Sequence, residues 1–169
     1  MAVLPIRSFP DPVLKEKTKP VEKIDGEINL LIKNMADTMY AAPGVGLAAN
    51  QVGVVKRVMV VDTSDKHQEL RVYINPEITW YSDEIEEDEE GCLSIFPSEI
   101  QVVVPRSVKI RFKAINEKGE PVEFEADGLL ARALQHEVDH LNGVLILDRT
   151  TPEERRRALK LLAEKRPLA

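Results

Sequence analysis

The middle of the chain carries five short segments that are typical of β-strands and that follow one another with no helical pattern between most of them. Residues Asn116 to Gly119 separate the last two segments and have the composition of a hairpin turn. Strands that are neighbours in sequence usually pair antiparallel, because a parallel pair needs a long crossover. We therefore expect antiparallel sheet and an α+β fold. The β-branched segments are residues 57–62, 70–75, 100–104, 108–115 and 121–126.

Two helical segments flank these strands. The first begins after Asp25, a residue type that caps helices, and ends near Ala41. The second covers residues 129–141 and ends at Asn142–Gly143, where glycine suits the left-handed conformation that closes a helix. Apolar residues recur in the first segment at three- and four-residue spacing and predict one buried stripe: Ile28, Leu31, Ile32, Met35 and Met39.

Three weaker patterns lie near the ends of the chain. Asp11 followed by proline is typical of the start of a short helix, and residues 144–147 are typical of a short strand. Thr151 precedes a C-terminal helix at about 152–166, whose first turn is acidic and whose later turns are basic. We favour an exposed helix with charges matched to its dipole, and the alternative is a helix whose cations meet RNA phosphates.

Length and composition limit the class of protein. A chain of 169 residues fits one domain that covers residues 1–169. The net charge of -6 argues against general binding to nucleic acids, so we expect no DNA partner. No apolar run approaches the roughly 20 residues of a membrane helix, and no signal peptide is visible. Because Cys92 is the single cysteine, an internal disulfide is excluded, and we expect a cytoplasmic protein with no membrane partner.

The strongest chemical signal is the H-E-x-x-H motif of His136, Glu137 and His140 within the second helix. Residues four apart lie one helical turn above each other, so the two imidazoles can hold one metal ion. Glu137 stays near the same face and can touch a water on the metal without binding the metal itself. A catalytic site needs a third protein ligand and one open position. No histidine follows His140, and His67 lies in a segment typical of an exposed turn.

Cys92 is the remaining candidate ligand, and its alternatives are a small buried residue or a nucleophile. It follows Gly91, which allows a close approach of the backbone. A thiolate with two imidazoles suits ferrous iron, zinc, nickel or cobalt and is a poor set for calcium or magnesium. The glycine-rich residues 44–51 form a turn after a helix, and they lack the marks of a phosphate loop or a dinucleotide fingerprint.

In combination, these segments resemble the signature motifs of the peptide deformylase family. The motifs are Gly-Val-Gly-Leu-Ala-Ala-Asn-Gln at 44–51, Glu-Gly-Cys-Leu-Ser at 90–94 and Gln-His-Glu-Val-Asp-His at 135–140. The segments at 9–14, 74–76 and 127–130 also resemble this family. The resemblance implies a metal-dependent amidohydrolase, and we expect mainly antiparallel sheets packed around a central metal-binding helix, with a C-terminal helix.

The resemblance implies a role for each residue of the motifs. Cys92, His136 and His140 hold one divalent metal ion with water in the fourth position. The ion is ferrous iron in many members and zinc in some, while nickel and cobalt suit the same ligands. The metal lowers the pKa of its water, so that hydroxide attacks the formyl carbon of a formyl-methionyl peptide on a nascent chain. Glu137 is the general base, and it then delivers the proton to the leaving amine.

Further roles belong to residues around the ligands. The side-chain amide of Gln51 and the backbone N–H of Leu93 stabilise the oxyanion, because both are donors aimed at the formyl oxygen. Glu90 supports the ligands from behind, with Arg106 as its expected partner.

The substrate is expected to lie along the first motif. The peptide backbone pairs with the chain near Gly44 and Gly46 as an added strand, which requires small residues there. Apolar side chains then surround the methionine: Val45, Leu129 and Ala133.

Three positions depart from the family pattern, and two other functions stay open. Arg132 stands where an apolar residue is commoner, Asn50 where proline or threonine is common, and residues 95–101 form a slightly longer segment. The first alternative is a metallopeptidase with the H-E-x-x-H motif, which the missing downstream ligand and the presence of Cys92 disfavour. The second is a non-catalytic structural metal-binding domain, which would have no use for Glu137.

Overall fold

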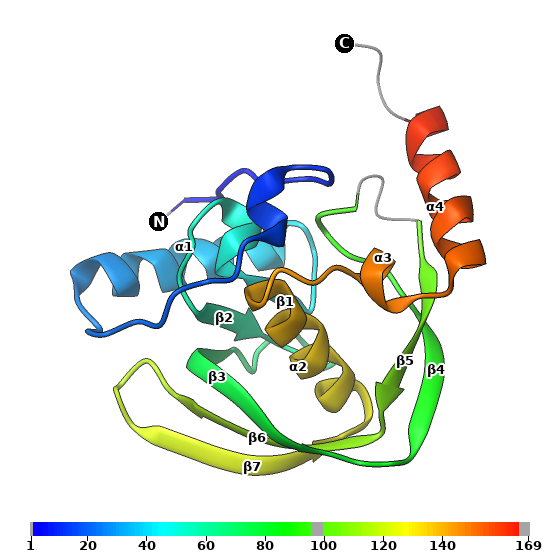
Figure 1. Ribbon diagram of the computed structural model, residues 1–169. Coiled ribbons are helices and arrows are strands. Elements are labelled where there is room, and N and C mark those ends of the chain that lie inside the picture. The colour runs from blue at the N-terminus through cyan, green and yellow to red at the C-terminus, as the bar shows by residue number, and fades with distance from the viewer. Residues whose placement is uncertain (1, 96–99, 166–169) are drawn as a thin grey trace.

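The computed structural model describes residues 2–95 and 100–165, and in these ranges the strands form two antiparallel sheets. The larger sheet has the strand order β1-β2-β3-β6-β7, and the smaller sheet pairs β4 with β5. Strand β3 leaves the larger sheet and leads into β4, so the two sheets share one curved surface (Figure 1). The bounds are β1 Gly46–Ala48, β2 Val58–Val61, β3 Arg71–Tyr81, β4 Ile85–Glu90, β5 Val102–Ser107, β6 Lys109–Ile115 and β7 Pro121–Asp127.

The helix α2 occupies the centre of the molecule, with both sheets around it (Figure 1). This arrangement confirms the expected α+β class, the antiparallel sheets and the central helix. Two short 3-10 helices, η1 and η2, lie before α1 and directly after β1. The bounds are η1 Pro12–Lys15, α1 Gly26–Ala41, η2 Ala49–Val52, α2 Gly128–Leu141, α3 Ile146–Arg149 and α4 Pro152–Lys165.

Strand β2 is buried on both faces, because α1 covers one face of the sheet and α2 covers the other. Val58 and Val60 pack in the cluster that contains the α1 stripe, while Met59 and Val61 pack in the cluster that contains α2. A strand with two buried faces reads as a continuous apolar run, which explains the sequence Val-Met-Val-Val. The sheet therefore holds α2 in a fixed position, with α1 as support on its far side.

The caps that were predicted from the sequence delimit the two long helices. Asp25 accepts a hydrogen bond from the N–H of Ile28 at 3.1 Å, which confirms the predicted start of α1. Gly143 has φ +75°, and its N–H donates to the carbonyl of His140 at 3.0 Å. This left-handed residue lies against the backbone of Lys15, so it also requires the absence of a side chain.

Several elements differ from the prediction. Residues 144–147 were expected to be a strand, but they lead into helix α3, because the Asp148 carboxylate accepts from the N–H of Leu145 at 2.9 Å and closes a helical turn. A short apolar run does not distinguish the two structures. Strand β3 extends to Tyr81, and strands β1 and β4 were not predicted at all. The acidic sequence of β4 is typical of a solvated loop, but a two-stranded sheet also leaves its charged side chains in solvent.

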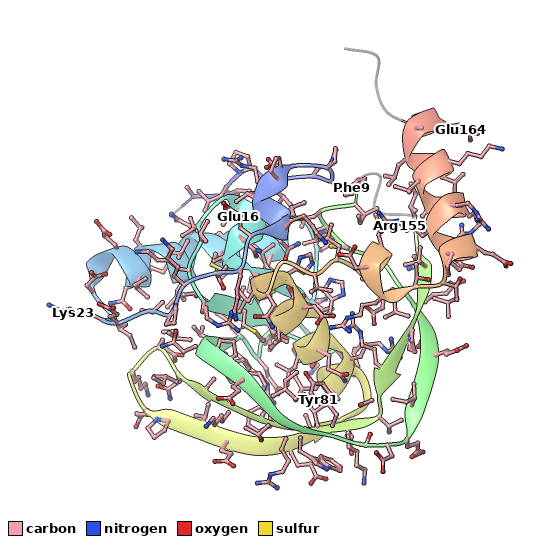
Figure 2. All side chains as sticks on the ribbon, in the orientation of Figure 1. Phe9, Glu16, Lys23, Tyr81, Arg155 and Glu164 are labelled. Carbon is pink, nitrogen blue, oxygen red and sulfur yellow. The ribbon has the colours of Figure 1, made fainter. Side chains whose placement is uncertain are left out.

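The C-terminal helix α4 begins as predicted, since the N–H of Glu154 donates to the Thr151 hydroxyl at 3.2 Å. It packs through Ala158 and Leu162 against the apolar cluster that contains β5. Glu164 projects outward at one end of the molecule and Lys23 at the other (Figure 2). The predicted end at 166 and part of the 95–101 segment lie outside the described residues. Among the helices of the described ranges, none is long and apolar enough to cross a membrane.

Candidate active site

Three side chains from two distant segments meet at the centre of the fold. Helix α2 places the Nε2 atoms of His136 and His140 3.2 Å apart, and the loop after β4 places Cys92 Sγ 3.1 Å from His140 Nε2. One ligand atom from each of the three residues lies within 4.8 Å of the others. Tetrahedral bonds of about 2.0–2.3 Å to one ion separate ligand atoms by roughly 3–4 Å, so these donors fit one metal ion.

The protonation of the two histidines differs because their neighbours differ. Burial and the charge of His136 hold the pKa of His140 well below its ordinary value. Burial also disfavours the charged form of His136, but Glu137, Cys92 and Glu90 outweigh this effect and hold its pKa well above the ordinary value. The cluster therefore favours one positive charge among its donors, and a divalent cation would supply positive charge at the same place.

A buried ion network lies behind His136. Its Nδ1 is 2.8 Å from Glu90 Oε1, so a proton on Nδ1 leaves Nε2 free to bind a cation. Arg106 donates to both oxygens of Glu90, at 2.9 and 3.0 Å, and to Asp139 at 2.6 Å. Burial opposes the ionisation of Glu90, but the bonds from His136 and Arg106 outweigh it and hold the pKa of Glu90 far below its ordinary value. The Glu90–Arg106 pair expected from the sequence is thus a bidentate contact in the interior.

Glu137 is buried on the opposite side of His136, and its environment has few donors. Its Oε2 lies 4.0 Å from His136 Nε2, and its Oε1 has no hydrogen-bond partner in the described part of the chain. Burial raises the pKa of Glu137 to about 7; the charges of Glu90 and Asp139 add to the rise, and those of His136 and Arg106 oppose it. A Cβ atom on Gly46 would lie 2.6 Å from Glu137 Oε2, which explains why glycine is needed there.

Gln51 and Leu93 lie on either side of Cys92. The Gln51 Oε1 accepts from the N–H of Ala48 at 2.9 Å, which fixes the amide in η2. Its Nε2 donates to Ser94 Oγ at 3.0 Å and lies 3.8 Å from Cys92 Sγ. Leu93 packs so tightly on Gly44 that a Cβ there would lie 2.7 Å from Leu93 Cδ1. The two predicted oxyanion donors are therefore held beside the thiol.

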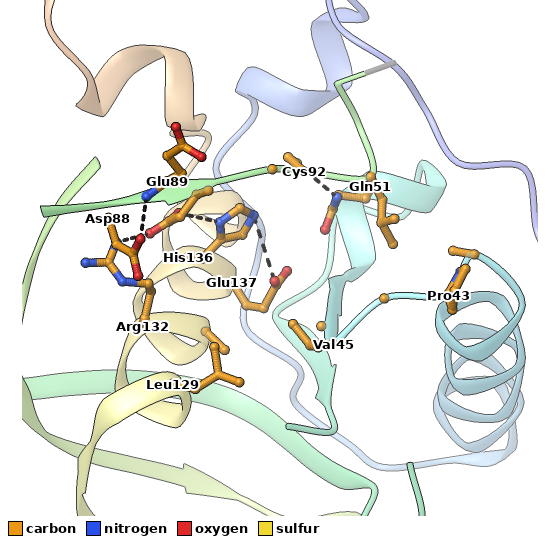
Figure 3. Close-up of a pocket in the computed structure, with 17 residues that line it drawn as sticks. Pro43, Val45, Gln51, Asp88, Glu89, Cys92, Leu129, Arg132, His136 and Glu137 are labelled. Atoms are coloured by element: carbon orange, nitrogen blue, oxygen red, sulfur yellow. Dashed lines mark hydrogen bonds and ion pairs between the residues drawn. The ribbon is translucent and has the colours of Figure 1, made fainter. Parts of the chain in front are cut away.

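A cavity of about 460 Å³ opens beside these groups (Figure 3). His140 and Arg106 are buried and do not line it. The predicted residues that line it are Gly44, Val45, Gly46, Gln51, Glu90, Cys92, Leu93, Leu129, Ala133, His136 and Glu137.

Sequence reasoning missed three residues that hold the site together. Asp139 receives bonds from Arg106 and Arg149. Asn50 donates to the carbonyl of His140 at 2.5 Å, and Arg132 contacts Glu90 and lines the cavity. Of the three, only Arg132 could have been placed near the site from the sequence, because it lies four residues before His136 and therefore on the same face of the helix.

Comparisons with known proteins agree with this geometry. A family model described as polypeptide deformylase matches residues 3–156. The peptide deformylase of Chromohalobacter salexigens is 49% identical over 165 residues, which cover 98% of this chain and 96% of the relative. The crystal structure of peptide deformylase from Thermotoga maritima has a TM-score of 0.83 and 48% identity, and the match covers 89% of this chain and 99% of that chain. A peptide deformylase from Synechococcus elongatus in complex with actinonin has a TM-score of 0.88 and 39% identity, with 98% and 91% covered. The chain therefore belongs to the polypeptide deformylase family.

Proposed function

We propose that the cavity beside α2 is where this chain hydrolyses the formyl group from the N-terminal formyl-methionine of nascent polypeptides. One observation carries the proposal. A sulfur and two imidazole nitrogens converge within 4.8 Å at the wall of a cavity, and a buried carboxylate with an unpartnered oxygen lines the same cavity. A structural metal site would have no need for such a carboxylate, whereas a hydrolase needs a base beside its metal.

Cys92, His136 and His140 would hold one divalent metal ion. The set of one thiolate and two neutral imidazoles suits ferrous iron, which we propose as the native metal, and it also suits zinc, nickel and cobalt. When bound, the ion supplies Lewis acidity that lowers the pKa of a water molecule it holds. Glu90 and Arg106 keep His136 in the orientation that this binding needs.

Glu137 is the proposed general base. Its unpartnered Oε1 is an acceptor for the proton of the attacking water, and no hydrogen bond to another described residue has to be broken first. The same carboxyl then delivers this proton to the amine of methionine as the carbon–nitrogen bond breaks.

Gln51 and Leu93 are the proposed donors to the formyl oxygen. The Gln51 amide donates to Ser94 Oγ at 3.0 Å and over a longer 3.8 Å to Cys92 Sγ, and the formyl oxygen would take the place of the thiol as the second acceptor. The backbone N–H of Leu93 follows Cys92 directly, so the position of the thiol decides where this donor points. Together they stabilise the negative charge that develops on oxygen as the water adds to the carbon.

The peptide is proposed to bind as an additional strand beside β1. This strand is at the edge of the larger sheet, and its Gly46 lines the cavity. An edge strand offers backbone groups that an extended peptide can pair with. Val45 and Leu129 are large apolar side chains with exposures of 40% and 58%, which burial by a methionine side chain would reduce. Ala133 leaves room for that side chain between them.

Release of formate from formyl-Met-Ala tests this function. Protein prepared without oxygen and loaded with ferrous iron should release formate at a rate proportional to its metal content. The Glu137→Ala variant should bind metal fully and release none. If the metal-loaded wild type releases no formate, the proposed reaction is wrong. Casein hydrolysis by the clean protein would then favour a metallopeptidase, and a metal centre with four protein ligands would favour a structural role.

We also propose a cytoplasmic location and, as a lesser alternative to a simply exposed helix, docking of α4 on the ribosome. Arg156 and Lys160 lie one turn apart on α4 and are exposed, and neither has an ion-pair partner in the described ranges. Such cations can bind RNA phosphates. Co-sedimentation with ribosomes should then be lost when the chain is truncated after Asp148, and its survival would contradict docking.

A further inference from the structure

The side chain of Arg132 joins three parts of the active-site wall. Arg132 lies one turn before His136 on α2, and its side chain is only 14% exposed. Figure 3 shows it beside strand β4, near Asp88. Nothing in the mechanism proposed above uses this cation.

The guanidinium of Arg132 reaches three acceptors that belong to different segments. Its Nη1 donates to Glu90 Oε2 at 2.5 Å and to the carbonyl of Val104 at 3.0 Å. Its Nη2 donates to the carbonyl of Glu86 at 2.8 Å. A planar fork with five N–H donors can serve several acceptors at once, whereas the ammonium of lysine is a compact point charge. The contacts fasten both strands of the smaller sheet to α2.

Two arginines hold the same carboxylate, and both donate to Glu90 Oε2. Arg106 binds Glu90 from the buried side, and Arg132 binds it from the side of the cavity. Strand β4 pairs with β5 alone in the described part of the chain, so its other edge depends on contacts such as those from Arg132. Residues at the end of β4, including Glu89 and Glu90, line the cavity.

We propose that Arg132 is a positioning residue for the deformylase reaction. It holds Glu90 in the position that orients His136, and it holds β4 as a wall of the substrate cavity. The inference rests on the proposed role of His136 as a metal ligand. Loss of Arg132 leaves Glu90 bound by Arg106, so the metal site persists with a less restrained imidazole, while the wall formed by β4 loses its attachment to α2.

The test compares Arg132→Met and Arg132→Lys with Arg111→Met in full-length protein loaded with Co²⁺. Arg111 is a matched control, because it undergoes the same change on strand β6, where it is exposed and pairs with Glu123 and Glu125 instead of Glu90. The measurements are cobalt affinity by competition with a chelator, the visible absorption bands of bound cobalt, and KM and kcat for formyl-Met-Ala.

The methionine variant is expected to bind cobalt about tenfold more weakly, because outer hydrogen bonds commonly change metal affinity by 10–100-fold. Its cobalt bands should shift, and its KM should rise more than its kcat falls. The lysine variant keeps a charge near Glu90, so its affinity should stay within about threefold of wild type. Its KM should still rise, because one ammonium group does not replace the bonds to Val104 and Glu86. The control should match wild type in every measurement.

Wild-type cobalt affinity, bands and KM in folded Arg132→Met would overturn the proposal. If that variant does not fold, the lysine variant decides, and an unchanged KM there overturns it. Glu90→Gln separates this failure from a failure of the proposed metal site. If Glu90→Gln alters the cobalt bands and the Arg132 variants do not, only the role of Arg132 is wrong. If none of these variants alters them, the proposed role of Glu90 and His136 is wrong as well.

Discussion

Two buried carboxylates, Glu90 and Glu137, lie on opposite sides of His136, and their pKa values are shifted in opposite directions. Glu90 is 6% exposed and Glu137 is 4% exposed, so both lose hydration to a similar extent. Glu90 has donors from His136, Arg106 and Arg132, and its pKa lies far below the ordinary value. Glu137 has an unpartnered oxygen, and burial raises its pKa to about 7. The donors and cations around Glu90 outweigh its burial and keep it charged, whereas those around Glu137 do not outweigh its burial.

The comparison separates what supports the site from what reacts in it. The side behind His136 is a closed network in which each charge has a partner. On the other side, the buried Glu137 carboxylate has an oxygen without a hydrogen-bond partner in the described part of the chain. An unpaired buried polar group lowers the stability of the fold unless a ligand supplies the missing hydrogen bond. We therefore expect changes behind His136 to affect stability and metal binding, and changes in front of it to affect the reaction.

The largest effect is expected for Glu137→Gln. The amide has the shape of the carboxyl group but accepts no proton, so kcat for formyl-Met-Ala should fall by about 10²–10⁴-fold. The free energy of unfolding at pH 7 should stay the same or rise slightly, because a poorly solvated carboxylate is removed. Steady-state kinetics and urea unfolding of the metal-loaded protein measure both. A large loss of stability with an unchanged kcat would mean that Glu137 supports the fold and does not take part in the reaction.

Glu90→Gln should show the opposite pattern. Arg106 is 5% exposed and would keep only Asp139 as a charged partner, so the free energy of unfolding should fall by about 3 kcal/mol. Metal affinity should fall by 10–100-fold, because His136 loses its orienting carboxylate. Urea unfolding and competition with a chelator are the measurements.

Glu87→Gln is the control for Glu90→Gln, since it makes the same change at an exposed position of β4. It should change the free energy of unfolding by less than about 0.5 kcal/mol. Equal losses of unfolding free energy in the two variants would mean that stability depends on the total charge of β4 and not on the contacts between Glu90 and the arginines.

Gly46→Ala tests whether the position of Glu137 in the cavity determines the rate of the reaction. A Cβ atom there would lie 2.6 Å from Glu137 Oε2 and 3.0 Å from its Cγ, so Glu137 has to move. Because small displacements of a catalytic group cost up to about 100-fold, kcat should fall by about 10–100-fold while the metal content stays unchanged. Gly26→Ala is the control, since its new Cβ would meet nothing within 4 Å. Equal kinetics in both variants would show that Glu137 tolerates displacement.

Local signals in the sequence were enough to predict the long helices and the convergence of the two histidines. A cap such as Asp25 and a terminal glycine such as Gly143 act within one turn of the chain, so neighbouring residues decide the outcome. The spacing of His136 and His140 on α2 is likewise a property of one helix. Cys92, in contrast, was connected to them through the family resemblance and not through any local rule.

The rest of the site depends on contacts between distant segments. Asp139 meets Arg106 across 33 positions, and Asn50 meets the His140 carbonyl across 90. The chain has 29 acidic residues, and nothing local marks Asp139 as one that meets an arginine in the interior. Strand β4 was missed because its acidic sequence is typical of a loop, and only pairing with β5 makes it a strand.

The smallest expected effect concerns another buried carboxylate, Asp62, which has several hydrogen-bond donors but no ion-pair partner among the residues that the structure describes. Burial opposes its ionisation, but bonds from Ser64, Tyr40 and the N–H of Glu69 outweigh burial and lower the pKa of Asp62 to about 2. A carboxyl whose pKa is lowered in the folded state adds stability above its ordinary pKa, and this stability is lost as the pH falls. The window for Asp62 therefore runs from about pH 4 down to about pH 2.

Asp62→Asn tests whether neutral donors alone lower the pKa of Asp62 and stabilise the fold, as the donors that include arginines do at Glu90. The variant should lose about 1–2 kcal/mol of unfolding free energy at pH 7, because an amide offers fewer acceptor sites to the donors around it. The difference from wild type should narrow as the pH falls below about 4, where the wild-type carboxylate begins to lose its advantage. Urea unfolding at pH 7, 5 and 3 measures this trend, with Asp65→Asn at a nearby exposed position as the control. A difference that stays constant with pH would mean that Asp62 stabilises the fold by packing, and that neutral donors alone do not lower the pKa of a buried carboxyl group.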